Sequence, residues 1–513
     1  MCVTQEVNPK IKYNMKKEII FLIATILCTS AMAKNKDEFI QDGFKYTICK
    51  DISGYVHANI SDAGKDFPLC ISDDSTLTIP ASVEYEGTEY DVEQIAYGAF
   101  ACRPEIKRLI ISEGITGMGG YAFYRCTNLV SVQLPSTFNS ITPPPYIMFD
   151  GCCNLMQVRV DPLNERYDSR EGCNAIISKA DSTLVFACSG TRIPTGVTTI
   201  GYGAFSQCEK VESIVVPEGI KRIEPNAFSN CPNLRNVSLP NTLEEIGYNA
   251  FNNCSGLKTI ELPSSLLGFK GSEHFYCCTS LSRIHIPEKV NLIPTSIFVG
   301  CTSLNNIDVD KRNKKYDSRK NCNAIVETSK DKLVAGCSSS VIVDGIKEIG
   351  EDAFAKSGIT SIFIPASVNR IDSTSFRGSR YCNSIVVEDG NPRYRSAGSN
   401  SMIEKSSNKL ILACSATHIL PDVTGVGGYA YLNTPETLII PSGVKYIEAN
   451  AFLDCADLLN VFIPSSVKRI GRFAFMGCSR LSSVIITNSN TKVDKDSFAE
   501  TPYDIMTRHQ FEQ

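Results

Sequence analysis

The chain has 513 residues, and its 51 basic and 55 acidic side chains leave a net charge of −4. Because proteins that bind nucleic acid generally carry a basic surplus, this balance argues against that class. The composition, 43% hydrophobic and 21% charged, is that of a globular protein, and five histidines are too few for a histidine-rich metal centre. The 22 cysteines need an explanation, since they could form disulfides or bind zinc.

The N-terminal segment has the pattern of a secretory signal peptide. Two lysines precede an apolar run over residues 19–27, and an Ala-Met-Ala cleavage site ends at Ala33. The run is too short to cross a bilayer, which takes about 20 apolar residues, and no later run is long enough. Cys28 would suit lipid attachment, but the bulky leucine before it argues against this. We therefore expect residues 1–33 to be a signal region, with translation starting at Met15.

Residues 34–75 are expected to form an N-terminal β cap. Residues 44–48 and 55–58 alternate between apolar and polar side chains as strands do, and residues 83–92 have the pattern of a hairpin that turns at Glu86-Gly87. This region lacks the repeat that follows it, and a stack of repeats needs a cap at each end.

From residue 76 to about residue 500 the chain repeats one unit. The phrase Ile200-Gly201-Tyr202-Gly203-Ala204-Phe205 returns at residues 246–251 and 470–475, and the commonest step is 23 residues. An apolar staircase follows, as in Leu234-x-x-Val237-x-Leu239-Pro240. Leu-x-x-Leu-x-Leu is the strand of a leucine-rich repeat, in which residues two apart face inward. The aromatic anchors of the unit are Phe100, Phe123, Phe149, Phe205, Phe228, Phe251, Phe275, Phe298, Phe354, Phe376, Tyr431, Phe452, Phe475 and Phe498.

Most cysteines occupy one place in this unit, three residues after the anchor. Because a solenoid stacks equivalent positions, we expect a buried column of free thiols that pack as small hydrophobic groups. Disulfides between neighbours are the alternative in an oxidising compartment. The repeat-length spacing disfavours zinc, and we expect no metal or other cofactor. The column comprises Cys126, Cys152, Cys208, Cys231, Cys254, Cys278, Cys301, Cys455 and Cys478.

Three steps between anchors are 55 or 56 residues long, so each contains an inserted block. Block 1 is expected at about 161–194, block 2 at about 310–343 and block 3 at about 389–421. In each block two apolar runs flank a polar turn, which is the pattern of a β-hairpin. Blocks 1 and 2 share Tyr-Asp-Ser-Arg, at residues 167–170 and 316–319, near a cysteine. No histidine recurs with this motif to activate a serine or cysteine, so we expect it to be structural.

The unit Ile-Gly-x-x-Ala-Phe-x-x-Cys-x-x-Leu-x-x-Val-x-Leu-Pro resembles the BspA-like leucine-rich repeats of bacterial surface proteins, over about residues 75–500. The resemblance implies a mainly β, right-handed leucine-rich-repeat solenoid. Here it would carry the N-terminal β cap, three inserted β-hairpin blocks and a C-terminal cap or tail at 501–513. It also implies an exported or cell-surface protein. Members of the family are associated with adhesion to host proteins or other cells, and the family has no catalytic motif to carry over.

The outward residues of the predicted strands form two columns. They are mostly polar up to Asn306 and Asp308, but after residue 360 one column becomes apolar beside a column of Ser, Thr and Asn. Five rungs at about 4.8 Å give a stripe roughly 20 Å long, which is a candidate interface. Alternatively, apolar residues simply favour strands, or the inserted blocks fold over the stripe. The candidate partner-binding residues are Phe363, Val386, Ile439, Phe462 and Ile485.

The sequence thus predicts a non-enzymatic exported protein of about residues 34–513, secreted, held at the cell surface or periplasmic. It would bind a protein or glycan of a host matrix or cell surface through this face. No Walker loop, His-Glu-x-x-His or Gly-x-Ser-x-Gly motif is present. A structural cell-envelope component is the main alternative. A carboxylate-based hydrolase is another, because acidic residues are plentiful. The ligand, the anchoring and the oligomeric state are not given by the sequence.

Overall fold

The computed structural model describes residues 38–50, 56–62, 69, 71–141, 145–396, 400–414 and 418–505. The expected signal region at 1–33 and the tail beyond residue 505 lie outside these residues. The chain divides into two compact units. The first takes in the described residues up to 141 together with Ile147–Cys152 and Val160–Asn164, and the second takes in Cys153–Arg159 and the described residues from Glu165 onward.

The first unit begins with a sheet that is antiparallel at its start. Its strands are β1 (Glu38–Gln41), β2 (Phe44–Lys50), β3 (Val56–Asp62), β5 (Ser82–Tyr85), β6 (Thr88–Ile95), β8 (Gly117–Met118) and β10 (Ser140–Ile141). Strands β1, β2 and β3 pair antiparallel, and β6 then joins β3 in parallel. The hairpin of β5 and β6 turns at Glu86-Gly87, as predicted, and both turn residues have positive φ. From β6 onward the pairing is parallel, one strand per repeat.

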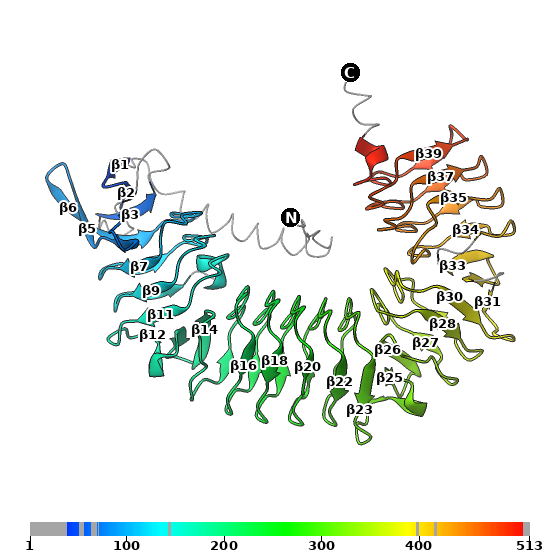
Figure 1. The fold of residues 1–513 in the computed structure, drawn as a ribbon, viewed down its shortest axis with the longest axis horizontal. Coiled ribbons are helices and arrows are strands. Elements are labelled where there is room, and N and C mark those ends of the chain that lie inside the picture. The colour runs from blue at the N-terminus through cyan, green and yellow to red at the C-terminus, as the bar shows by residue number, and fades with distance from the viewer. Residues whose placement is uncertain are drawn as a thin grey trace. The chain divides into compact units, whose positions relative to one another are not determined.

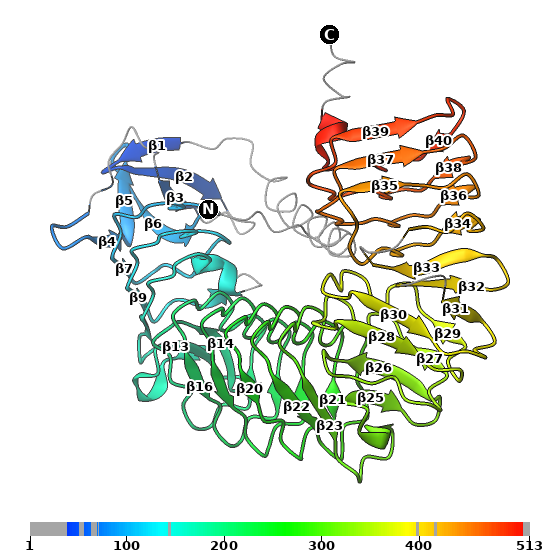
Figure 2. The same cartoon turned by 45° about the vertical axis from the view of Figure 1, so that its right-hand side comes forward.

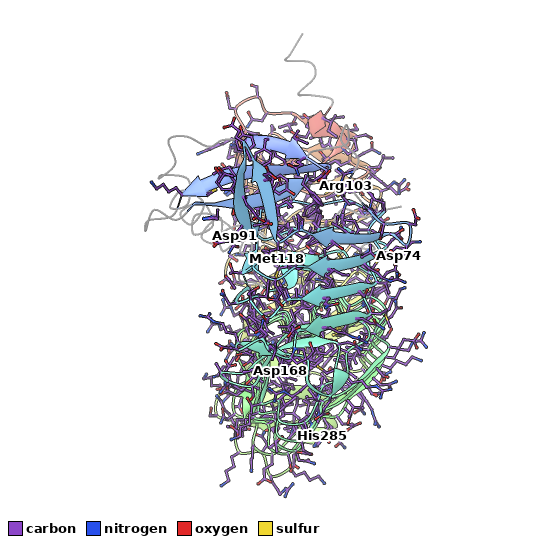
Figure 3. The ribbon with its side chains drawn as sticks, turned by 90° about the vertical axis from the view of Figure 1, so that its left-hand side faces the viewer. Asp74, Asp91, Arg103, Met118, Asp168 and His285 are labelled. Atoms are coloured by element: carbon purple, nitrogen blue, oxygen red, sulfur yellow. The ribbon has the colours of Figure 1, made fainter. Side chains whose placement is uncertain are left out.

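The second sheet of this unit shows the repeat most simply. Strands β4 (Thr76–Ile79), β7 (Arg108–Ile111) and β9 (Ser131–Leu134) pair in parallel. Side chains of β7 alternate, with Leu109 and Ile111 buried and the residues between them exposed. In the turn that precedes β7, Arg103 (labelled in Figure 3) donates through Nε to Asp62 of β3, in the preceding sheet, at 2.7 Å.

Each repeat has two strands, a first strand formed by the apolar staircase and a shorter second strand. In the second unit the first strands of successive repeats pair in parallel ladders, which we call the outward ladders. The polar ladder contains β16 (Ser213–Val215), β18 (Asn236–Ser238), β20 (Thr259–Ile260), β22 (Arg283–Ile286) and β23 (Asn306–Val309). Two apolar ladders follow: β28 (Ser361–Ile364) with β30 (Ser384–Val387), then β35 (Thr437–Ile439), β37 (Asn460–Ile463) and β39 (Ser483–Ile486). Figure 1 shows β16, β18, β20 and β22 side by side. Strand β11 (Gln157–Val160) lies at the boundary between the units.

The shorter second strands of the repeats form three further sheets, and each of these begins with an inserted block. In every block three strands pair antiparallel, and the third then pairs in parallel with the next repeat. Figure 2 shows the last of these sheets from β33 to β40. The sheet of block 1 contains β12 (Tyr167–Asp168), β13 (Ala175–Ser178), β14 (Thr183–Ala187), β15 (Thr199–Ile200), β17 (Arg222–Ile223), β19 (Glu245–Ile246) and β21 (Gly268–Phe269). The sheet of block 2 contains β24 (Tyr316–Asp317), β25 (Ala324–Glu327), β26 (Lys332–Gly336), β27 (Glu348–Ile349) and β29 (Arg370–Ile371). The sheet of block 3 contains β31 (Tyr394–Ser396), β32 (Ser401–Glu404), β33 (Lys409–Ala413), β34 (Gly425–Val426), β36 (Tyr446–Ile447), β38 (Arg469–Ile470) and β40 (Lys492–Val493). Short 3₁₀ turns are η1 (Pro145–Phe149), η2 (Arg170–Gly172) and η3 (Arg319–Asn321).

Between the inserted blocks the core contains stacked aromatic rings, because each repeat there places its anchor over the anchor of the repeat before. All 14 predicted anchors are buried. The ring of Phe228 lies 5.1 Å from that of Phe205 and 5.2 Å from that of Phe251, with interplanar angles of 20° and 6°. Such stacking stabilises the fold beyond the contribution of the apolar area that each ring buries.

Two left-handed residues flank most of the anchors and turn the backbone toward the next repeat. In one rung these are Asn226 and Asn230, with φ of 57° and 58°. Their amide N–H groups donate to Tyr248 and Asn252 of the following rung at 3.0 and 2.7 Å. Asn tolerates this conformation better than most residues, which explains its frequency at these two places.

Candidate functional site

The five candidate partner-binding residues all point outward from the apolar ladders. Their neighbours on either side along the strands, such as Ile362 and Ile385, are buried, except beside Ile485, where Val484 and Ile486 are half-buried. The alternation of the strand therefore separates a core face from an exposed apolar face, as the sequence predicts. The exposed fractions are 47% for Phe363, 47% for Val386, 66% for Ile439, 38% for Phe462 and 53% for Ile485.

These residues do not form one five-rung ladder, which corrects the expectation of a continuous 20 Å stripe. Phe363 pairs with Val386 in one ladder, and Ile439, Phe462 and Ile485 pair in another. The physical reason is block 3, whose strand β32 packs against β30 and so takes the place where the next outward strand would add. The apolar surface is therefore two patches, one of two rungs and one of three.

A column of small polar residues accompanies the apolar one. In the three-rung ladder it contains Thr437, Asn460 and Ser483, which are paired in register. The Asn460 side-chain amide donates to Thr437 Oγ1 at 3.0 Å. This hydrogen bond between neighbouring strands holds the Asn460 and Thr437 side chains in place. The apolar side chains of the patch therefore lie beside polar side chains that are hydrogen-bonded to each other.

The polar ladder uses the same repeat positions for charge. Arg283 Nη2 lies 2.7 Å from Glu261 Oε1, and His285 Nδ1 lies 2.9 Å from Asp308 Oδ2. All four side chains are largely exposed, and His285 projects from β22 (Figure 3). Exposed pairs of this kind contribute little to stability. The fold therefore accepts charged outward residues without difficulty.

The Tyr-Asp-Ser-Arg motifs make hydrogen bonds within their own blocks. Ser318 Oγ donates to Ala324 O at 2.6 Å and Ser169 Oγ donates to Ala175 O at 2.6 Å, so neither hydroxyl is a free nucleophile. Arg319 holds Asp317 through both oxygens. Burial alone would raise the pKa of Asp317, but these hydrogen bonds outweigh it and the pKa is lowered. The carboxylate therefore stays ionised as a partner of the arginine.

The cysteines of the column are buried free thiols. Cys231, Cys254 and Cys278 each donate Sγ–H to the backbone carbonyl of the anchor in the preceding rung, at 3.0–3.1 Å. Where Ser379 replaces cysteine, its hydroxyl makes the same bond to Phe354 O at 2.6 Å. Burial raises the pKa of the Cys278 and Cys301 thiols, so these two remain protonated and unreactive.

Among the described residues no group of three or more His, Cys, Asp and Glu side chains is placed to hold a metal ion. The same part of the chain contains no helix with the length and apolar character needed to span a membrane.

A depression of about 460 Å³ lies where β29 meets block 3. Sequence reasoning missed it, although several of its residues fall within the predicted bounds of block 3. Its charged groups come from two rungs, and their convergence depends on how block 3 packs on β29, for which the sequence carries no signal. The lining residues are Asn369, Arg370, Pro392, Arg393, Glu404, Lys405 and Ser406.

The family model described as "BspA type Leucine rich repeat region" matches the chain with six copies, over residues 82–169, 198–326, 332–422 and 413–507. No curated protein matches the chain. Among solved structures, a leucine rich cell surface protein from Faecalibacterium prausnitzii is 20% identical, with 91% of this chain and 98% of that one covered and a TM-score of 0.37. A leucine-rich repeat protein from Bacteroides ovatus is 22% identical, with 89% and 99% covered and a TM-score of 0.42.

Proposed function

This chain belongs to the BspA-type leucine-rich repeat family, and from that premise we propose that it is a non-enzymatic, exported protein that binds a protein partner through its two apolar patches. The patches are Phe363 with Val386, and Ile439 with Phe462 and Ile485. Export is supported by the signal-peptide pattern of residues 1–33.

The observation that carries the proposal is the contrast between the outward ladders. The same repeat position holds His285 and Asp308 in the polar ladder, where β22 and β23 pair in register over four residues. Strand propensity therefore does not require Phe363 or Ile439 to be apolar. Leaving such side chains in water forgoes free energy that burial against a partner would recover, at about 25 cal/mol per Å².

The patches suit a protein better than a membrane or a small ligand. Each consists of side chains one strand spacing apart on a sheet face, beside the Ser, Thr and Asn column. An apolar centre with a hydrogen-bonding border is the usual anatomy of a protein interface. Phe363 and Phe462 supply the aromatic side chains that often dominate the binding energy.

The Phe363→Ser, Ile439→Ser, Phe462→Ser triple variant tests the proposal. We expect it to keep the far-UV circular dichroism of the parent, because the three side chains lie outside the core. It should lose at least tenfold in affinity for whichever protein is retained from a panel of purified extracellular-matrix proteins. The matched control changes Glu261, His285 and Asp308 to Ser at the same repeat positions of the polar ladder, and should bind like the parent.

Equal loss in both triple variants would contradict a role for the apolar patches. Unchanged binding by the apolar variant would do the same. Retention of glycans alone on an array, with no protein bound, would favour the glycan alternative, and no binding of either would favour an envelope component.

A further inference from the structure

The depression at block 3 has a different chemistry from the apolar patches. We propose that it is a binding site for an acidic sugar residue, in which Arg370 and Lys405 bind the sugar carboxylate and Glu404 accepts a sugar hydroxyl. This site is independent of the proposed apolar interface, since it lies on the second strand of the rung and shares no residue with the patches.

Three cations converge here from two neighbouring rungs. Arg370 lies on β29, and Arg393 and Lys405 face each other at the end of the β31–β32 pair, where Lys405 N donates to Arg393 O at 2.9 Å. Arg393 bridges the rungs, since its Nη1 donates to Asn369 O at 3.1 Å. The convergence is thus built by the packing of block 3 on the preceding repeat.

Arg370 and Lys405 have donors to spare for a ligand. Among the described residues Arg370 makes one ion pair, in which its Nη1 lies 3.4 Å from Glu348 Oε2, and two thirds of its side chain is exposed. Lys405 Nζ donates to Asn391 O at 2.6 Å, which uses one of its three donors. A guanidinium and an ammonium at one site are a strong attractor for a carboxylate.

Arg393 has a positioning role. Its Nε and Nη2 donate to Glu404 Oε1 at 3.1 and 2.9 Å, and its guanidinium lies over the ring of Tyr394. Glu404 also accepts from Ser407 Oγ at 2.6 Å. The hydrogen bonds from Ser407 and Arg393 lower the pKa of Glu404, so the carboxylate lining the depression stays ionised.

The ionised Glu404 makes the site selective for an acidic sugar over an acidic peptide. A carboxylate accepts about four hydrogen bonds, one more than the three it receives here, so it has room for a hydroxyl donor. It would repel a second acid that entered beside it. A sugar ring with one carboxylate and several hydroxyls satisfies both conditions, whereas a run of aspartate or glutamate does not. Ser406 and Asn369 add polar lining, and Pro392 adds an apolar surface for the C–H face of the ring.

Block 2 provides an internal comparison. Lys315 takes the place of Arg393, because each precedes a buried tyrosine, and Lys315 Nζ reaches Asn291 O at 2.8 Å in the same way. However, Leu292 takes the place of Arg370 and Thr328 that of Lys405, whose backbone bond Thr328 reproduces at 3.0 Å. Block 2 therefore has the same scaffold without the two available cations.

The test is a titration of the full chain with glucuronic acid, N-acetylneuraminic acid, glucose and triglutamate, followed by ligand-observed NMR. We expect saturable binding of at least one acidic sugar and none of glucose or triglutamate. Arg370→Gln and Lys405→Gln should each weaken that binding about tenfold, and added salt should weaken it further. Lys315→Gln, which removes the cation of block 2 at the position of Arg393, should leave it unchanged.

Three results would overturn the proposal. The first is the absence of binding by both acidic sugars, and the second is binding of triglutamate in preference to them. The third is an equal effect of Lys315→Gln and Lys405→Gln, which would show a general charge effect. Loss of protein binding in the apolar triple variant does not bear on any of these, so the two proposals succeed or fail separately.

Discussion

His274 is a buried histidine whose titration should couple folding to pH. Its side chain has no exposed surface and occupies the place that Ala227 and Ala250 fill in the preceding rungs. Nε2 donates to Lys270 O at 3.0 Å, and Nδ1 has no partner within the described part of the chain. Burial lowers the pKa of His274 from 6.5 to about 4, against the opposing effect of its backbone hydrogen bonds.

The sign and size of the effect follow from these two pKa values. Between pH 6.5 and 4 the unfolded chain takes up a proton at His274 and the native chain does not, so acidification favours unfolding. The contribution of neutral His274 to the free energy of unfolding is fully present above pH 6.5. It declines as the pH falls and changes no further below about pH 4. Since one pKa unit corresponds to about 1.4 kcal/mol, the free energy of unfolding should fall by ~3 kcal/mol from this residue alone.

His274→Ala removes the titration and installs the residue of the neighbouring rungs. We expect the variant to be the less stable protein at neutral pH, because the lost imidazole leaves a cavity. The deficit should shrink by ~3 kcal/mol by pH 4, since all other titrating groups are shared. Urea unfolding followed by far-UV circular dichroism measures this, and the chain has no tryptophan to report on it by fluorescence.

His285→Ala is the control, because it removes an exposed imidazole from β22. This variant should keep the acid sensitivity of the parent. A stability gap between the parent and His274→Ala that stays constant from pH 7 to pH 4 would refute the reasoning.

Two further predictions concern the buried framework. Asn391→Ala should lower the free energy of unfolding by ~3 kcal/mol, because the side chain donates to two carbonyls and accepts from two amide N–H groups; urea midpoints measure this, and an equal loss in the exposed Asn490→Ala would contradict it. Alkylation of the native protein should label Cys102, the exposed thiol, well before Cys278, whose pKa is raised by burial. Peptide mass spectrometry reads the order, and early labelling of Cys278 would disprove the packing argument.

The repeat made most of the fold predictable. Stacking forces equivalent residues into columns, so the spacing alone identified the buried anchors and the buried cysteines. The period of two along each strand identified Phe363 and Ile439 as exposed. Asn beside some of the anchors carried a further signal that was not used, since residues such as Asn226 mark the left-handed turns.

Features that depend on contacts between a block and a repeat were beyond the sequence. The interruption between Val386 and Ile439 arises because β32 packs against β30, and no local pattern encodes that contact. The cation cluster of Arg370 and Lys405 likewise joins residues 35 positions apart whose register is set by block 3. Local periodicity predicts which face of a strand a residue lies on. It does not predict which other element packs beside that strand.

The inserted blocks also explain why each outward ladder ends where it does. The last strand of a ladder would otherwise expose unpaired backbone groups that recruit other strands. In block 2 the side-chain amide of Asn323 replaces that missing strand, accepting from Ile307 N at 2.9 Å and donating to Asn305 O at 2.8 Å. Ser318 Oγ lies 3.3 Å from Ile307 O on the same strand. A block therefore closes one ladder and lets the next begin with different outward residues. This is how one repeat sequence presents a mostly polar surface before block 2 and apolar patches after it.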